Sequence, residues 1–171
     1  MSTENTGAIK ENIEKIKLRV AQAAQKSGRD PKDIKIIAVT KTVDTERIME
    51  AIGAGVTDVG ENRVQELCNK YDIIGTQCNW HLIGSLQTNK VKYIVDKVAM
   101  IHSLDRIELA EEIQKRAERI SRIVDVLVQV NVAKEETKSG IYLEQAYDFV
   151  KEVSQYGNIR IRGLMTIAPF A

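Results

Sequence analysis

Short apolar runs alternate with longer amphipathic segments along the chain. Each apolar run is typical of a buried strand, and each amphipathic segment is typical of a helix with one apolar face. The predicted strands begin near residues 35, 57, 79, 100, 124 and 159. Because a helical segment separates each strand from the next, the pattern predicts a parallel sheet with right-handed crossovers.

An extra helix is expected before the first strand. Apolar residues there recur at spacings of four and three, which is the period of one helix face, and Ser27-Gly28 follows as a stop signal. The residues of this face are Ile9, Ile13, Ile16, Val20 and Ala23.

The first predicted strand, Ile34–Lys41, ends on a lysine. Side chains alternate between the two faces of a strand, so Lys41 shares a face with Ile37 and Val39. The carboxyl end of a buried strand is where α/β proteins place their chemistry. The alternative interpretation is a solvated lysine at the start of a loop.

Two architectures fit this alternation. An open doubly wound sheet suits the length of 171 residues. A (β/α)₈ barrel typically needs about 250 residues, so here it would be truncated before strands seven and eight. Polar residues at or near the strand ends favour the barrel, because a barrel surrounds one site with the ends of many strands. These residues are Lys41, Asn62, His81, Ser103, Asn131 and Thr166. We therefore expect one α/β domain over residues 1–171, an incomplete TIM-type barrel with an N-terminal helix.

Composition and charge narrow the classes of function. The chain has 25 basic and 24 acidic residues and a net charge of +1, which gives no electrostatic case for nucleic acid or an anionic membrane. No apolar run approaches a membrane span, and the polar first ten residues do not resemble a signal peptide. Its two cysteines form neither a disulfide framework nor a zinc pattern, so we expect a cytoplasmic protein with free thiols and no metal requirement.

Five blocks of sequence, in this order, resemble the pyridoxal-phosphate homeostasis proteins. They are Ile37-Ala38-Val39-Thr40-Lys41, Gly60–Glu66, Trp80–Lys90, Lys138-Ser139-Gly140 and Gly163–Ile167. The resemblance covers essentially the whole chain and implies a barrel like the N-terminal domain of alanine racemase. It also implies a protein that carries or buffers pyridoxal 5′-phosphate, in vitamin B6 and amino-acid homeostasis, without robust catalysis.

By this resemblance, Lys41 looks like the lysine that forms a Schiff base with pyridoxal 5′-phosphate. A Schiff base forms from the neutral amine, and desolvation in a barrel mouth favours that form over the ammonium. Placement at the end of a strand would also fix the reach of the side chain.

Asn62 and His81 each have two interpretations. Asn62 resembles a family residue near the cofactor ring, but it also stands where a helix N-cap is expected, with Gln65 three residues later as in a capping box. His81 belongs to the expected cofactor site, and a histidine inside a strand is more often a hydrogen-bonded structural group than an acid or base.

Met165 is expected to pack near the cofactor, although a strand methionine is usually part of the core. Lys138 lies in a polar connection and is either a second amine that meets aldehydes or a solvated lysine. His102 and the two cysteines are assigned structural roles.

The family pattern continues beyond this sequence, with a Ser-Met-Gly-Met-Ser-like stretch and a Gly-Ser/Ala-Thr…Arg-Ile-Gly stretch that hold the cofactor phosphate. The chain is therefore expected to keep the covalent anchor and to lack the phosphate clamp. The full-length family is expected to be monomeric or weakly dimeric. The unpaired edges of this shorter chain, Lys35–Thr40 and Ile159–Ala168, are expected to favour self-association.

Two rival functions remain. A racemase-like or lyase enzyme could use the same lysine, but it needs a second acid or base opposite it. An interaction domain in which Lys41 is incidental is the other alternative.

Overall fold

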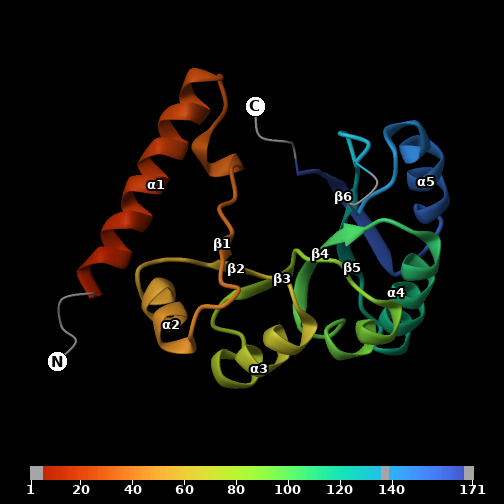
Figure 1. Cartoon of the computed structure of the whole chain (residues 1–171), viewed down its shortest axis with the longest axis horizontal. Helices are drawn as coiled ribbons and strands as arrows, with labels where there is room; N and C mark the ends of the chain where they lie inside the picture. The colour runs from red at the N-terminus through yellow and green to blue at the C-terminus, as the bar shows by residue number, and fades with distance from the viewer. Residues whose placement is uncertain (1–5, 136–138, 168–171) are drawn as a thin grey trace.

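The computed structural model describes residues 6–135 and 139–167. Six parallel strands form one sheet in the order β1-β2-β3-β4-β5-β6 (Figure 1). They are β1 (Ala38–Val39), β2 (Asp58–Glu61), β3 (Asn79–Leu82), β4 (Val98–Leu104), β5 (Val124–Gln129) and β6 (Ile159–Met165).

Helical segments precede or connect the strands. The α-helices are α1 (Thr6–Lys26), α2 (Thr45–Gly53), α3 (Val64–Ile74), α4 (Ile107–Arg119) and α5 (Ala146–Val153). Three short 3-10 helices are η1 (Pro31–Asp33), η2 (Thr88–Tyr93) and η3 (Leu143–Gln145). The segment between β3 and β4 was expected to be an α-helix, but it is the 3-10 helix η2. This 3-10 helix buries Val91, and the turn that follows it buries Ile94 and Val95.

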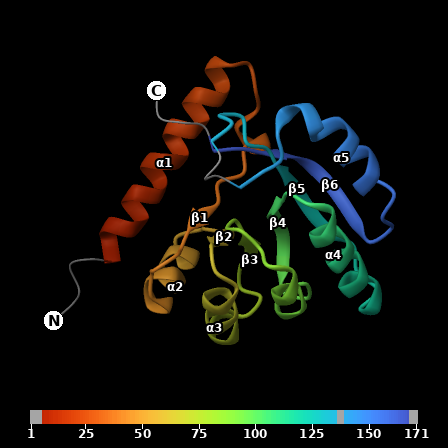
Figure 2. The ribbon, with the colours of Figure 1, turned by 45° about the vertical axis from the view of Figure 1, so that its right-hand side comes forward.

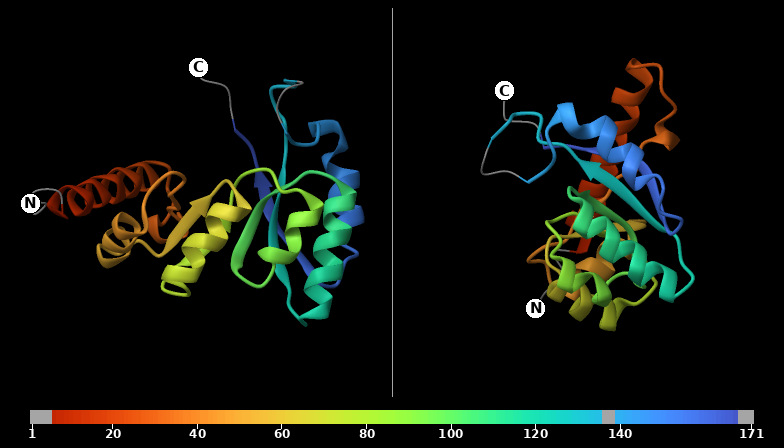
Figure 3. Two further views of the ribbon diagram at one scale, coloured as in Figure 1. Left: turned by 60° about the horizontal axis from the view of Figure 1, so that its bottom comes forward. Right: turned by 90° about the vertical axis from the view of Figure 1, so that its right-hand side faces the viewer.

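The strand order distinguishes the two expected architectures. A doubly wound sheet reverses its strand order at a switch point, whereas here each strand pairs with the next one along the chain. Figures 2 and 3 show α2 to α5 along the outer side of the curved sheet, as in a barrel. The predicted barrel architecture is confirmed, with six of its strands present.

The core lies between the sheet and these helices. Side chains such as Val59, Leu82 and Ile101 are completely buried there, together with Leu67 of α3 and Ile113 of α4. Alternation along each strand then sends the intervening side chains to the concave face. That face carries the polar residues discussed below.

The first strand is much shorter than the predicted Ile34–Lys41. Only Ala38 and Val39 pair with β2, and residues 34–37 precede the strand without ladder pairing. Ile36 and Val39 are 38% and 52% exposed, although the sequence predicted a buried strand. The reason is position: β1 is an edge strand, so its other side has no neighbour in the sheet.

Helix α1 forms as predicted and contacts α2 at the β1 end of the sheet (Figure 1). Part of its apolar face borders a groove of about 780 Å³ against the chain around β1. Ile16 on this face remains 48% exposed. No helix in the described ranges is long and apolar enough to span a bilayer.

The structure also defines the start of α2 and the end of β6. Asp44 caps α2, since its carboxylate accepts a hydrogen bond of 2.9 Å from the Arg47 backbone N–H. Strand β6 ends at Met165, and the predicted end of that strand, Ala168, lies outside the described residues.

Candidate functional site

A cavity of about 550 Å³ lies at the carboxyl ends of the strands. Its volume falls in the range of about 300–1,000 Å³ that is usual for small-molecule sites. The carboxyl-terminal face is also where barrels of this kind carry their sites. Polar residues from all six strands, or from the turns that follow them, contribute to its lining. They include Lys41, Asn62, Ser85, His102, Gln129 and Thr166.

Lys41 directly follows β1 and lines this cavity. The chain turns immediately afterwards, because Thr42 adopts a left-handed backbone conformation with φ of 64°. Lys41 is exposed, so the described residues do not supply the desolvation that was expected of a barrel mouth. The lysine is therefore placed at the site but open to water.

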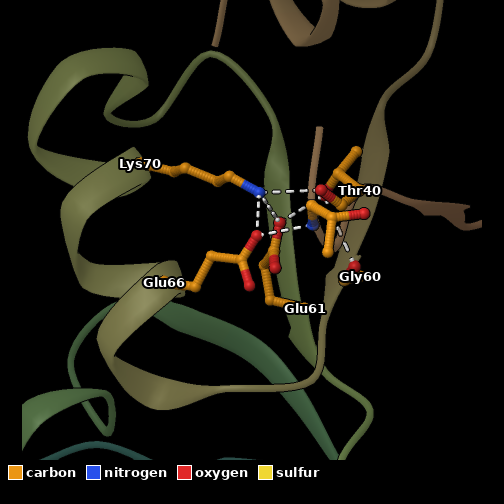
Figure 4. Close-up of polar contacts among 6 residues, drawn as sticks. Thr40, Gly60, Glu61, Glu66 and Lys70 are labelled. Carbon is orange, nitrogen blue, oxygen red and sulfur yellow. Dashed lines mark hydrogen bonds and ion pairs between the residues drawn. The ribbon is translucent and has the colours of Figure 1, made fainter. Parts of the chain in front are cut away.

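A buried cluster lies behind Lys41 on the outer face of the sheet, and we call Thr40, Glu61, Glu66 and Lys70 the Lys70 cluster (Figure 4). The ammonium of Lys70 donates to Glu61 Oε1 at 2.8 Å and to Glu66 Oε1 at 2.7 Å. It also donates to the carbonyl oxygen of Thr40 at 2.7 Å. The hydroxyl of Thr40 in turn donates to Glu61 Oε1 at 2.6 Å.

Charge pairing stabilises this cluster despite its burial. Burial opposes the ammonium form, but the hydrogen bonds to Glu61 and Glu66 raise the pKa of Lys70 above its ordinary value. The hydrogen bond from Lys70 likewise lowers the pKa of Glu66, assisted by the Thr42 backbone N–H, which donates to Glu66 Oε1 at 2.7 Å. The residues on both sides of Lys41 are thus held by side chains of β2 and α3.

Asn62 lines the cavity and does not cap a helix. Helix α3 begins at Val64 with Arg63 at the N-cap position, and no side chain caps it. The capping-box interpretation is therefore wrong. Gly84 lies against the same residue: a Cβ added at Gly84 would stand 2.3 Å from the Asn62 carbonyl oxygen, so only glycine allows this approach.

His81 is buried and is not part of the cavity lining. Its Nε2 lies 2.9 Å from Asp58 Oδ1, and its Nδ1 lies 2.9 Å from His102 Nε2. His102, which the sequence analysis treated as structural, is the histidine that lines the cavity. The sequence contains no signal for this, because it depends on which residues of β2, β3 and β4 lie side by side.

Burial and hydrogen bonding set the charges of this group. Burial alone would raise the pKa of Asp58, yet the hydrogen bonds that it accepts, first of all from His81, lower that pKa from 3.8 to about 2. Burial lowers the pKa of His81. Burial also lowers the pKa of His102 to about 4, with a further contribution from His81. The carboxylate is therefore ionised and both imidazoles are neutral near pH 7.

The remaining predicted residues lie on the far side of the cavity or outside the described chain. Met165 ends β6 and lines the cavity. Gln129 donates to the Ser139 carbonyl oxygen at 3.1 Å, and the hydroxyls of Ser85 and Ser139 lie 3.0 Å apart. Lys138 lies outside the described residues. A polar Gln129 at the end of a mainly apolar strand was the available signal for its role in the lining.

The cysteines are both free. Burial raises the pKa of Cys78 to about 11, which keeps this thiol protonated and unreactive. No cluster of three or more His, Cys, Asp or Glu side chains that could hold a metal ion occurs within residues 6–135 and 139–167.

Comparison with known sequences identifies similar proteins. Residues 5–171 match the family described as alanine racemase, N-terminal domain. The chain is 43% identical over 161 residues to a pyridoxal phosphate homeostasis protein of Aquifex aeolicus, which covers 94% of this chain and 71% of that protein.

Solved structures agree with the fold. The crystal structure of an unknown protein from Bifidobacterium adolescentis superimposes with a TM-score of 0.93 at 33% identity, over 100% of this chain and 74% of that one. PipY of Synechococcus elongatus PCC7942, in its structure with PLP bound, gives a TM-score of 0.75 at 32% identity. That match covers 89% of this chain and 71% of PipY.

Proposed function

Because the chain belongs to the pyridoxal phosphate homeostasis protein family, we propose that it binds pyridoxal 5′-phosphate covalently through Lys41. One observation carries this proposal: Lys41 lines a cavity of ligand size at the carboxyl ends of the strands. The function proposed is to carry the cofactor in vitamin B6 and amino-acid homeostasis.

The chemistry asked of Lys41 is that of a primary amine. The neutral amine of Lys41 would attack the aldehyde carbon. A carbon–nitrogen double bond would replace the carbon–oxygen double bond, and the aldehyde oxygen would leave as water with the two protons of the amine. The product would be a Schiff base between Lys41 and the aldehyde group that the cofactor supplies. The Lys70 cluster supports this step because it holds the backbone on either side of Lys41.

The other cavity residues fit the cofactor in part. Asn62 offers an amide for hydrogen bonding, and Met165 offers an apolar surface for a pyridine ring. His81 does not line the cavity, but it contacts the lining residue His102 through a hydrogen bond of 2.9 Å. Among the described lining residues, Lys41 is the only cationic side chain, so these residues do not neutralise a phosphate dianion. The chain alone is therefore expected to hold the cofactor mainly by its covalent bond.

Borohydride reduction tests the proposal. The full chain is incubated with pyridoxal 5′-phosphate, reduced, digested and mapped by mass spectrometry, with the near-ultraviolet and violet absorption recorded before reduction. We expect the label on Lys41 and its loss in Lys41→Ala. Lys32→Ala is the matched control, because Lys32 is also exposed but does not line this cavity. A label on another lysine with Lys41 unmodified would contradict the proposal.

A further inference from the structure

Asp58, His81 and His102 form a hydrogen-bonded row across three neighbouring strands. They belong to β2, β3 and β4, and they are only 2%, 2% and 8% exposed. Both contacts that join them measure 2.9 Å. Buried polar residues at such distances fix one another's orientation, because any other arrangement leaves a buried group unpaired.

Asp58, at one end of the row, accepts hydrogen bonds from two further side chains. Lys35 Nζ donates to Asp58 Oδ1 at 3.0 Å, and the Thr57 hydroxyl donates to Asp58 Oδ2 at 2.7 Å. An ionised carboxylate can only accept hydrogen bonds. The proton in the contact with His81 therefore belongs to His81 Nε2.

This assignment determines the tautomer of both rings. A neutral imidazole carries one N–H, so His81 Nδ1 is an acceptor once His81 Nε2 is the donor. His102 Nε2 must then donate to His81 Nδ1. The proton of a neutral His102 is used in this contact, and His102 Nδ1 carries the free lone pair.

His102 is the member of the row that borders the cavity, where Lys41 also lies. Within residues 6–135 and 139–167, His102 Nδ1 has no hydrogen-bond partner. A hydrogen-bond acceptor on a residue that lines such a cavity is typical of the few polar groups that orient a ligand.

We propose that His102 Nδ1 accepts a hydrogen bond from an O–H or N–H group on the pyridine ring of the bound cofactor, and that Asp58 and His81 are positioning residues that fix its tautomer. This inference rests on the proposed function and adds a specificity determinant to it. The contact would favour ring systems that present a donor over apolar aldehydes of similar size.

Nitrogen-15 NMR of histidine-labelled full chain tests the tautomer directly. Without ligand, we expect His102 to carry its proton on Nε2. In Asp58→Asn the amide can donate to His81 as well as accept from it, so we expect a mixture of tautomers at both rings. A wild-type His102 protonated on Nδ1 would overturn the inference.

Addition of pyridoxal 5′-phosphate to the same sample tests the contact. We expect the His102 Nδ1 resonance to shift as the absorption of the Lys41 adduct develops. An adduct that forms while this resonance stays unchanged overturns the inference and leaves the proposed function standing. Absence of any adduct overturns both.

Cofactor analogues and variants test specificity. An analogue without the ring hydroxyl and an analogue methylated on the ring nitrogen each remove one donor. We expect one of them to bind wild type roughly three- to tenfold more weakly, the range of a single hydrogen bond. His102→Leu should lose this discrimination, and His102→Gln, which retains an acceptor, should keep part of it. Equal binding of both analogues and the cofactor by wild type would contradict the proposal.

Discussion

Lys70 Nζ donates a hydrogen bond of 2.7 Å to the carbonyl oxygen of Thr40, the residue immediately before Lys41. The ladder between β1 and β2 joins only two residue pairs, and the Thr40 backbone N–H adds one hydrogen bond of 3.0 Å to the Gly60 carbonyl oxygen. A side chain from α3 therefore adds to the backbone hydrogen bonds that fix the chain just before the proposed cofactor lysine (Figure 4).

Removal of the Lys70 ammonium should destabilise the protein strongly. The side chains of Lys70 and Glu61 are 9% and 0% exposed, so Lys70→Met leaves a buried carboxylate without its partner. Breaking a buried pair in this way typically costs about 3–5 kcal/mol. Urea unfolding measures this loss, and Lys115→Met on the exposed face of α4 is the control, expected within about 0.5 kcal/mol of wild type. Equal midpoints for the two variants would show that the cluster does not support the fold.

Stability should fall in acid partly because of Asp58. Its pKa is lowered from 3.8 to about 2 in the folded protein, so its contribution is present above pH 3.8 and lost as the pH falls through 2. A shift of this size corresponds to about 2 kcal/mol. Asp58→Asn should flatten the pH dependence of unfolding between pH 5 and 2 by about that amount. Asp33→Asn, at an exposed carboxylate in η1, should retain the wild-type slope, and an unchanged slope in Asp58→Asn would argue against the contact network.

Gly84→Ala should distort the cavity wall. The new Cβ would stand 2.3 Å from the Asn62 carbonyl oxygen, a backbone atom that cannot move independently. Overpacking of this kind costs about 1–3 kcal/mol, and we also expect weaker cofactor binding. Gly157→Ala is matched, since a Cβ there meets nothing within 4 Å. Equal melting temperatures and equal cofactor affinities for the two variants would contradict the close approach of Gly84 to the Asn62 carbonyl oxygen.

The 171-residue polypeptide should self-associate through the edge at β1. Ile36 is 38% exposed beside an unpaired strand, and exposed edges recruit other chains. Ile36→Lys should reduce association in sedimentation velocity runs over a concentration series. Ile73→Lys on α3 is the control, because Ile73 is 67% exposed but lies away from the strand edges. A monomer at every concentration would rule this out.

Periodicity predicted most of the helices and strands, because each of them is determined by residues close together in the sequence. Helix α1 and the alternation of strands with helical segments follow from spacings within a few residues. The position of Lys41 at the carboxyl end of β1 also follows from its place after an apolar run. These features do not require knowledge of which strands are neighbours.

The predictions that were wrong depend instead on contacts between elements that are distant in the sequence. The length of β1 depends on whether a strand lies on its other side, and the role of Asn62 depends on where α3 begins. The contact between His81 and His102 depends on the register of β3 and β4, which includes a shift between Trp80 and His81. A single sequence does not encode such registers in its periodicity, so the resemblance to a known family was needed to single out the cavity.

The Lys70 cluster has a consequence for the order in which the molecule is made. Its longest contact joins residues only 30 positions apart, and all its members precede β3 in the chain. Contacts of moderate sequence separation form faster than contacts between distant parts of a chain, and folding during synthesis begins with the N-terminal part. The backbone that presents Lys41 can therefore be shaped on the ribosome before most of the cavity around it has been translated.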